Sequence, residues 1–134
     1  MAYSVLADLE NKFGTRAIAR WSDVDETGSV DTANVADAIS DADQLINEIL
    51  FPVHTIPFSG IIPTITNISV MLAGFNLYVM RGLRDNSSDE HMTQVRQTAL
   101  DLLHRIVDGQ RLLNSTNSEI IRKGKGAPIA INLT

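Results

Sequence analysis

The chain has 134 residues, of which 44% are hydrophobic and 20% are charged, with a formal net charge of -5 and no cysteine. This length and composition predict one folded core, and the missing cysteines exclude disulfide scaffolds, thiolate zinc sites and cysteine nucleophiles. The negative charge argues against non-specific binding of nucleic acid, because affinity for phosphate comes mainly from clustered Lys and Arg. Residues 1–11 contain acids and no long apolar run, so we expect no secretory signal and synthesis in the cytoplasm.

The first 21 residues predict a short N-terminal helix and then one or two further helical turns. In residues 4–13, the apolar positions have a helical spacing, and Gly14 follows as a stop signal. In residues 15–21, we expect Ile18 and Trp21 to point inward. A polar loop, residues 22–31, comes next.

Three longer segments have the periodicity of helices. Residues 31–51 have one apolar face and an acidic opposite face, and Asp31 or Thr32 can cap the first turn. Residues 64–83 are apolar on nearly every side, which predicts a helix buried by neighbours on several faces. Residues 87–109 open with the capping-box string Ser-Ser-Asp-Glu and stop at a glycine.

The loop of residues 51–63 is rich in proline and joins the first two of these helices. Its prolines divide a long stretch without Asp, Glu, Lys or Arg and leave only residues 64–80 for an uncharged helix, fewer than the about 20 residues that a bilayer requires. We therefore expect a core helix and no membrane partner. Pro52, Pro57 and Phe58 are candidate partner-binding residues, whereas Trp21 and Tyr78 are expected in the core.

The end of the chain differs from the helical part. Arg122, Lys123 and Lys125 alternate with glycines, and the apolar residues Ile129, Ile131 and Leu133 then alternate with small or polar ones. A basic tail is usually solvated, but the apolar end favours docking on a partner. We predict an all-α fold: a small helical bundle of three main helices plus a short N-terminal helix, with a long proline-rich loop (helical domain, residues 1–113) and an extended C-terminal arm (residues 114–134).

The string of residues 23–31, here called the acidic turn, is similar to the first part of an EF-hand calcium loop. Asp23, Asp25, Thr27 and Asp31 supply oxygens at fitting positions, but Asn34 stands where the loop normally has its closing bidentate glutamate. The alternative is a polar turn whose Asp and Thr side chains bond local amides. We favour this alternative, with no metal and no cofactor.

No catalytic motif accompanies these features. The three histidines lack ligand spacing, and the sequence has neither a G-x-S-x-G elbow nor a glycine-rich phosphate loop after a strand. We therefore expect a protein that is not an enzyme.

The order of the parts resembles the phage Mu-type head-tail connector family. The resemblance rests on the acidic turn DVDETGSVD, the helix VADAISDADQLINEIL, the proline-rich loop, the string NLYVMR and the string RIVDGQRLL, and it covers residues 5–113. It implies a virion protein of the phage neck, assembled in the host cytoplasm.

The resemblance also implies partners. Copies of such a subunit form a ring, expected to be dodecameric, that contacts the portal protein on one side and a tail terminator or other neck protein on the other. DNA passes through the lumen without specific binding, and the ring completes the filled head. The alternatives are a calcium-responsive helical adaptor, another phage-encoded protein-binding module and a small helical enzyme.

Overall fold

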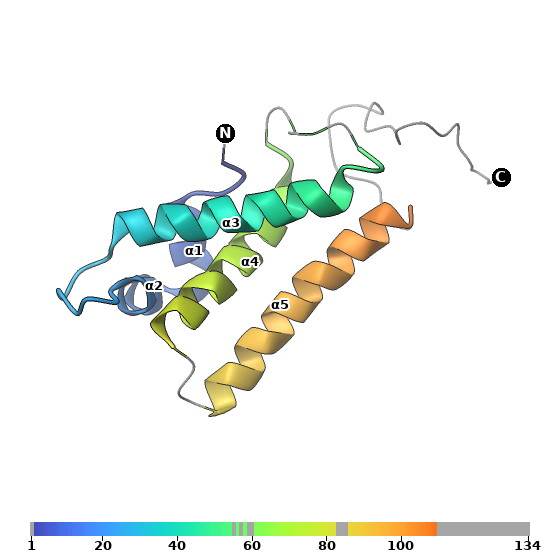
Figure 1. The fold of residues 1–134 in the computed structure, drawn as a ribbon. Coiled ribbons are helices and arrows are strands. Elements are labelled where there is room, and N and C mark those ends of the chain that lie inside the picture. Colours follow the sequence, from blue (N-terminus) through green and yellow to red (C-terminus); the bar gives the residue numbers. More distant parts are fainter. Residues whose placement is uncertain (1, 55, 57, 59–60, 83–85, 110–134) are drawn as a thin grey trace.

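The computed structural model describes residues 2–54, 56, 58, 61–82 and 86–109, with the backbone alone for residues 86–88. These residues form five α-helices and no strand (Figure 1), so the predicted all-helical bundle is confirmed. The three main helices are α3 (Thr32–Leu50), α4 (Pro63–Arg81) and α5 (Asn86–Val107). Two short helices precede them, α1 (Leu6–Phe13) and α2 (Thr15–Ser22). The one or two turns predicted after Gly14 form α2, which the predicted count of one short helix did not include.

Local signals explain where the helices begin and end. The Asp31 carboxylate accepts from the amide of Asn34 at 3.0 Å, which confirms the predicted cap of α3. At the start of α1, the Asp8 carboxylate accepts from the amide of Val5 at 3.0 Å. Gly14 separates α1 from α2 with a φ of 98°, a conformation that favours glycine. Pro63 begins α4, where its missing N–H costs no helical hydrogen bond.

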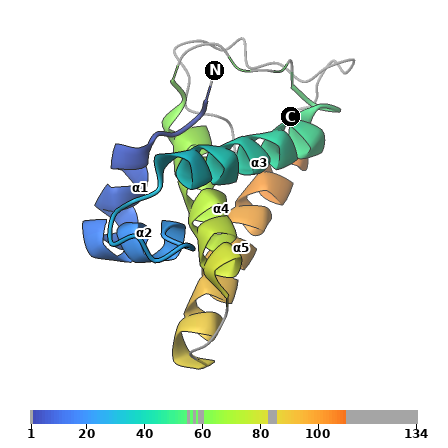
Figure 2. The same cartoon turned by 60° about the vertical axis from the view of Figure 1, so that its left-hand side comes forward.

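Helix α4 lies at the centre of the bundle. It contacts each of α1, α2, α3 and α5, and Figures 1 and 2 show it between α3 and α5 with the α1–α2 pair at its side. Its fully buried side chains point to several sides of the helix, among them Ile65, Ile68, Leu72 and Leu77. This burial confirms the prediction made from its uniformly apolar sequence.

Aromatic rings join the α1–α2 pair to α4. The Trp21 ring lies 5.4 Å from the centre of the Phe13 ring and 5.4 Å from that of Tyr78, and Tyr78 donates to the Asp89 carboxylate of α5 at 2.6 Å. Trp21 and Tyr78 are both buried, as predicted. The Phe13 ring covers Gly74, and a Cβ added at Gly74 would overlap it. This glycine therefore permits the close approach of α1 to α4.

A buried polar network attaches the N-terminal segment to α3 and α4. The carboxylate of Asp43 accepts from the amide of Tyr3 at 2.9 Å and from the hydroxyl of Ser69 at 2.7 Å. Ser69 also lies 2.7 Å from the hydroxyl of Ser4, and the Tyr3 hydroxyl donates to Asn47 at 2.5 Å. Burial raises the pKa of Asp43 above its ordinary value, because the fold removes water from a carboxyl that is 8% exposed. The N-terminal segment is thus fixed by specific bonds.

None of the helices in the described part of the chain is long and apolar enough to span a bilayer. This finding agrees with the reading of residues 64–83 as a core helix.

Candidate functional site

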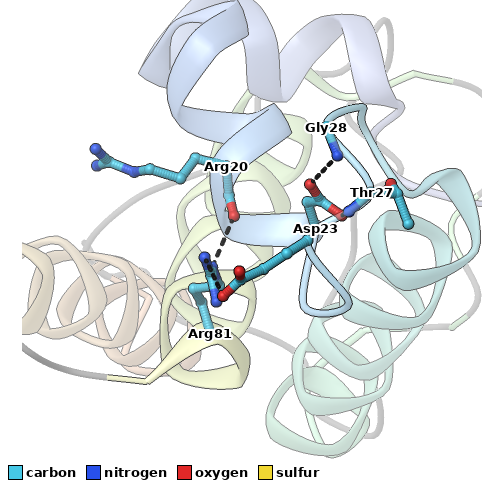
Figure 3. A network of polar contacts seen from close by, with 6 residues as sticks. Arg20, Asp23, Thr27, Gly28 and Arg81 are labelled. Atoms are coloured by element: carbon cyan, nitrogen blue, oxygen red, sulfur yellow. Dashed lines mark hydrogen bonds and ion pairs between the residues drawn. The ribbon is translucent and has the colours of Figure 1, made fainter.

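The acidic turn is organised around one carboxylate. Asp23 accepts from the amide of Thr27 at 2.7 Å, from the Thr27 hydroxyl at 2.9 Å and from the amide of Gly28 at 2.7 Å (Figure 3). The hydrogen bonds from the Thr27 amide, and then from the Gly28 amide, lower the pKa of Asp23. The predicted turn, in which Asp and Thr side chains bond local amides, is confirmed.

Hydrogen bonds also hold the C-terminal side of the acidic turn, where it meets α3. Asn34, at the position of the closing EF-hand ligand, donates its side-chain amide to the Ser22 carbonyl at 2.8 Å, and Asp31 caps α3. Asp25 is exposed. Within the described residues, no group of three or more His, Cys, Asp or Glu residues could hold a metal ion. In this structure hydrogen bonds therefore close the turn.

Arg81, the last residue of α4, connects the acidic turn to the end of α2. Its Nε donates to the Arg20 carbonyl at 3.1 Å, and its Nη2 lies 3.6 Å from the Glu26 carboxylate (Figure 3). The carbonyl it contacts is one that the end of α2 leaves without a helical partner. The acidic turn and the C-terminal end of α4 consequently form one end of the bundle.

Large apolar side chains are exposed at the proline-rich loop, at the acidic turn and in the last turn of α4, and Val5 beside α1 is a further one. Ile61 precedes α4 and is 81% exposed, and Phe51, at the other end of the proline-rich loop, is 57% exposed. At the opposite end of α4, Val79 and Met80 are 45% and 40% exposed, and Val24 of the acidic turn is 40% exposed. We call these the loop end (Phe51, Ile61) and the turn end (Val24, Val79, Met80). Large apolar side chains that stay exposed at two defined places are typical of contact surfaces.

The predicted partner-binding residues divide into three groups. Pro52 is exposed beside Phe51, as a contact residue requires. Phe58 is a correction: it is only 7% exposed, and its ring packs 5.8 Å from that of Tyr3 and 6.0 Å from that of His54, so it belongs to the core. The remaining predicted residues lie outside the described part of the chain: Pro57, Arg122, Lys123, Lys125, Ile129, Ile131 and Leu133.

A groove lies between the N-terminal segment and α3, and we call it the N-terminal groove. Its volume is about 470 Å³, and its apolar lining comes from Val5 and Leu6 on one side and from Val35, Ala36 and Ile39 on the other. Exposed polar residues of α3, Ser40 and Gln44, border it.

Sequence reasoning missed this groove and the Asp43 network beneath it. A signal was present, because Asp43 follows Ile39 by four residues and precedes Ile46 by three, which places it on the apolar stripe of α3. A carboxylate on an apolar stripe predicts a buried polar partner. The partners themselves, Tyr3 and Ser69, come from distant segments and have no local signal.

Comparison with known proteins assigns the chain to a family. No curated protein matches it. A sequence model of the family described as "Bacteriophage Mu, Gp36" matches residues 3–128, which include all five helices and extend into the C-terminal arm. Since this match spans nearly the whole chain, the protein belongs to the bacteriophage Mu Gp36 family.

Proposed function

We propose that this phage protein is a non-enzymatic head-tail connector subunit, which forms a ring between the portal and the tail and completes the DNA-filled head. The observation that carries the proposal is the pair of exposed apolar ends on a phage-family helical bundle. Helix α4 has 19 residues and is thus about 28 Å long, so the loop end and the turn end are well separated. A subunit placed between two partners needs two separate contact surfaces of this kind.

The charge of the chain fits a channel through which DNA passes without being held. Between Arg20 and Arg81 the sequence contains eight acidic residues and no Lys or Arg. A stretch of this charge offers phosphate no cationic partner, and it repels the DNA backbone.

The proposal is tested by inactivating the gene in a phage that encodes it and examining the lysate by electron microscopy. Filled heads and free tails should accumulate separately, and the wild-type gene supplied in trans should restore joined particles. Normal tail joining without the protein would contradict the connector role.

Variants of the two ends sharpen the test. Ile61→Glu and Met80→Glu place a charge on the loop end and the turn end, and each should prevent restoration because burying an unpaired charge opposes association. Thr98→Glu, on the exposed outer face of α5, is the matched control and should restore joining. The buried Trp21 reports by its fluorescence that all three variants remain folded.

A further inference from the structure

The N-terminal groove is apolar inside, and an acidic row lies beyond its α3 rim. The exposed carboxylates of Asp37, Asp41 and Glu48 are three or four residues from the rim residues Ser40 and Gln44 on the same helix, and the sequence has no Lys or Arg between residues 20 and 81. The groove thus fits a segment that carries positive charge next to a few aliphatic side chains. Its volume of about 470 Å³ is within the range of binding pockets.

One segment of this chain has that chemistry. Residues 110–134 lie outside the described part of the chain, and they contain four cationic residues and one acid. Three of the cations, Arg122, Lys123 and Lys125, come just before the alternating Ile129, Ile131 and Leu133. In an extended segment these three side chains would point to the same side.

We propose that residues 122–134 of one copy dock in the N-terminal groove of a second copy. The aliphatic side chains lie against Val5, Ala36 and the neighbouring apolar lining, and the cations lie near the carboxylates of α3. This inference rests on the proposed function, because it identifies the contact by which neighbouring subunits of the ring hold each other.

Chain length permits docking on a second copy, and symmetry favours it. The 20 residues from 110 to 129 can span up to about 66 Å when extended, twice the about 33 Å length of α5, so the segment can leave its own bundle. The groove and the arm are different surfaces of the same chain. A contact between two different surfaces is heterologous, which is the kind that closes a ring of identical subunits.

The absence of cysteine allows a direct test on the full-length protein. One preparation carries Ser40→Cys at the edge of the groove and a second carries Ala130→Cys in the arm. Equal amounts are mixed and treated with a short bismaleimide, and crosslinked dimers are measured on a denaturing gel. In the control, the first preparation carries Asp101→Cys, on the exposed face of α5, instead of Ser40→Cys. Its crosslink yield should be about tenfold lower, because docking brings the thiol at position 130 close to position 40 and not to position 101.

A second pair of variants tests the groove itself. Ala36→Arg fills and charges the groove and, added to the Ser40→Cys copy, should lower the crosslink yield about tenfold. Ala33→Arg, on the same helix outside the groove lining, should leave the yield unchanged. Circular dichroism of all five preparations shows whether the helices are retained.

Two results would overturn the inference. One is an equal yield with Ser40→Cys and Asp101→Cys, and the other is a link confined to single chains when both cysteines are on the same copy. If either is found while the protein still forms rings and is needed for tail joining, the groove assignment fails and the connector role stands. Normal tail joining without the protein would refute the connector role whatever the crosslinks show.

Discussion

The contact of the Phe13 ring with Gly74 predicts that Gly74→Ala changes the free energy of unfolding in opposite directions with and without that ring. Gly74→Ala should gain about 1 kcal/mol from helix propensity, because Gly74 lies inside α4. The added Cβ would overlap the Phe13 ring, and Trp21 packs against that ring, 5.4 Å away between ring centres. Overpacking of this kind costs about 1–3 kcal/mol. We therefore expect a net loss of about 1 kcal/mol in the free energy of unfolding.

The double mutant isolates the cause. In a Phe13→Ala background the overlap is gone, so Gly74→Ala should stabilise by about 1 kcal/mol and the effect reverses sign. Urea unfolding followed by the fluorescence of Trp21, the only tryptophan, measures all four members of the cycle. If Gly74→Ala has the same effect with and without the Phe13 ring, the close approach of α1 to α4 is not what requires the glycine.

Three further predictions concern the core, the buried carboxyl and the acidic turn. Leu72→Ala should cost about 2–5 kcal/mol in urea unfolding, because Leu72 is 2% exposed in the central helix, and a loss under about half a kcal/mol would show that α4 is not the centre of the core. Because the pKa of Asp43 is raised in the folded state, its contribution to stability is complete below the ordinary pKa of 3.8 and is lost as pH rises through the raised folded pKa. Between these two pKa values, wild type should therefore lose stability relative to Asp43→Asn as pH rises. A stability difference that does not change with pH would refute this. Calcium or a chelator should leave the melting temperature unchanged because Asp23 already accepts three hydrogen bonds, whereas a large rise with calcium would show that the turn binds the ion.

The arm gives a separate expectation about folding. Deleting residues 122–134 should leave a helical chain that melts cooperatively, because residues 3–106 already form a buried core within the described part of the chain. Thermal melting by circular dichroism measures this, and loss of the cooperative transition would show that the arm is needed for folding.

Periodicity predicted the main helices because their apolar residues recur at helical spacing along the chain. The stripe of residues 31–51 located α3, and the uniformly apolar residues 64–83 located the buried α4. Helix α2 was predicted as one or two turns but not counted as a separate helix, because an 8-residue helix has little periodicity of its own and its stability comes from packing on α4.

The candidate site could be predicted only where its chemistry is local. The acidic turn followed from the sequence, since Asp23 bonds residues four and five positions later. The groove, the Asp43 network and the link from Arg81 to Glu26 join segments 26 or more residues apart, and no local pattern encodes them. Phe58 was assigned to a partner because loop position does not reveal burial, which depends here on the distant ring of Tyr3.

The copy number of this protein in purified, infectious virions tests the connector role most directly. Quantitative mass spectrometry with isotope-labelled peptides from this chain and from the portal would provide the ratio. The connector role predicts one copy for each portal subunit, retained in joined particles and absent from the free tails that accumulate without the gene. Absence of the protein from infectious virions would contradict it.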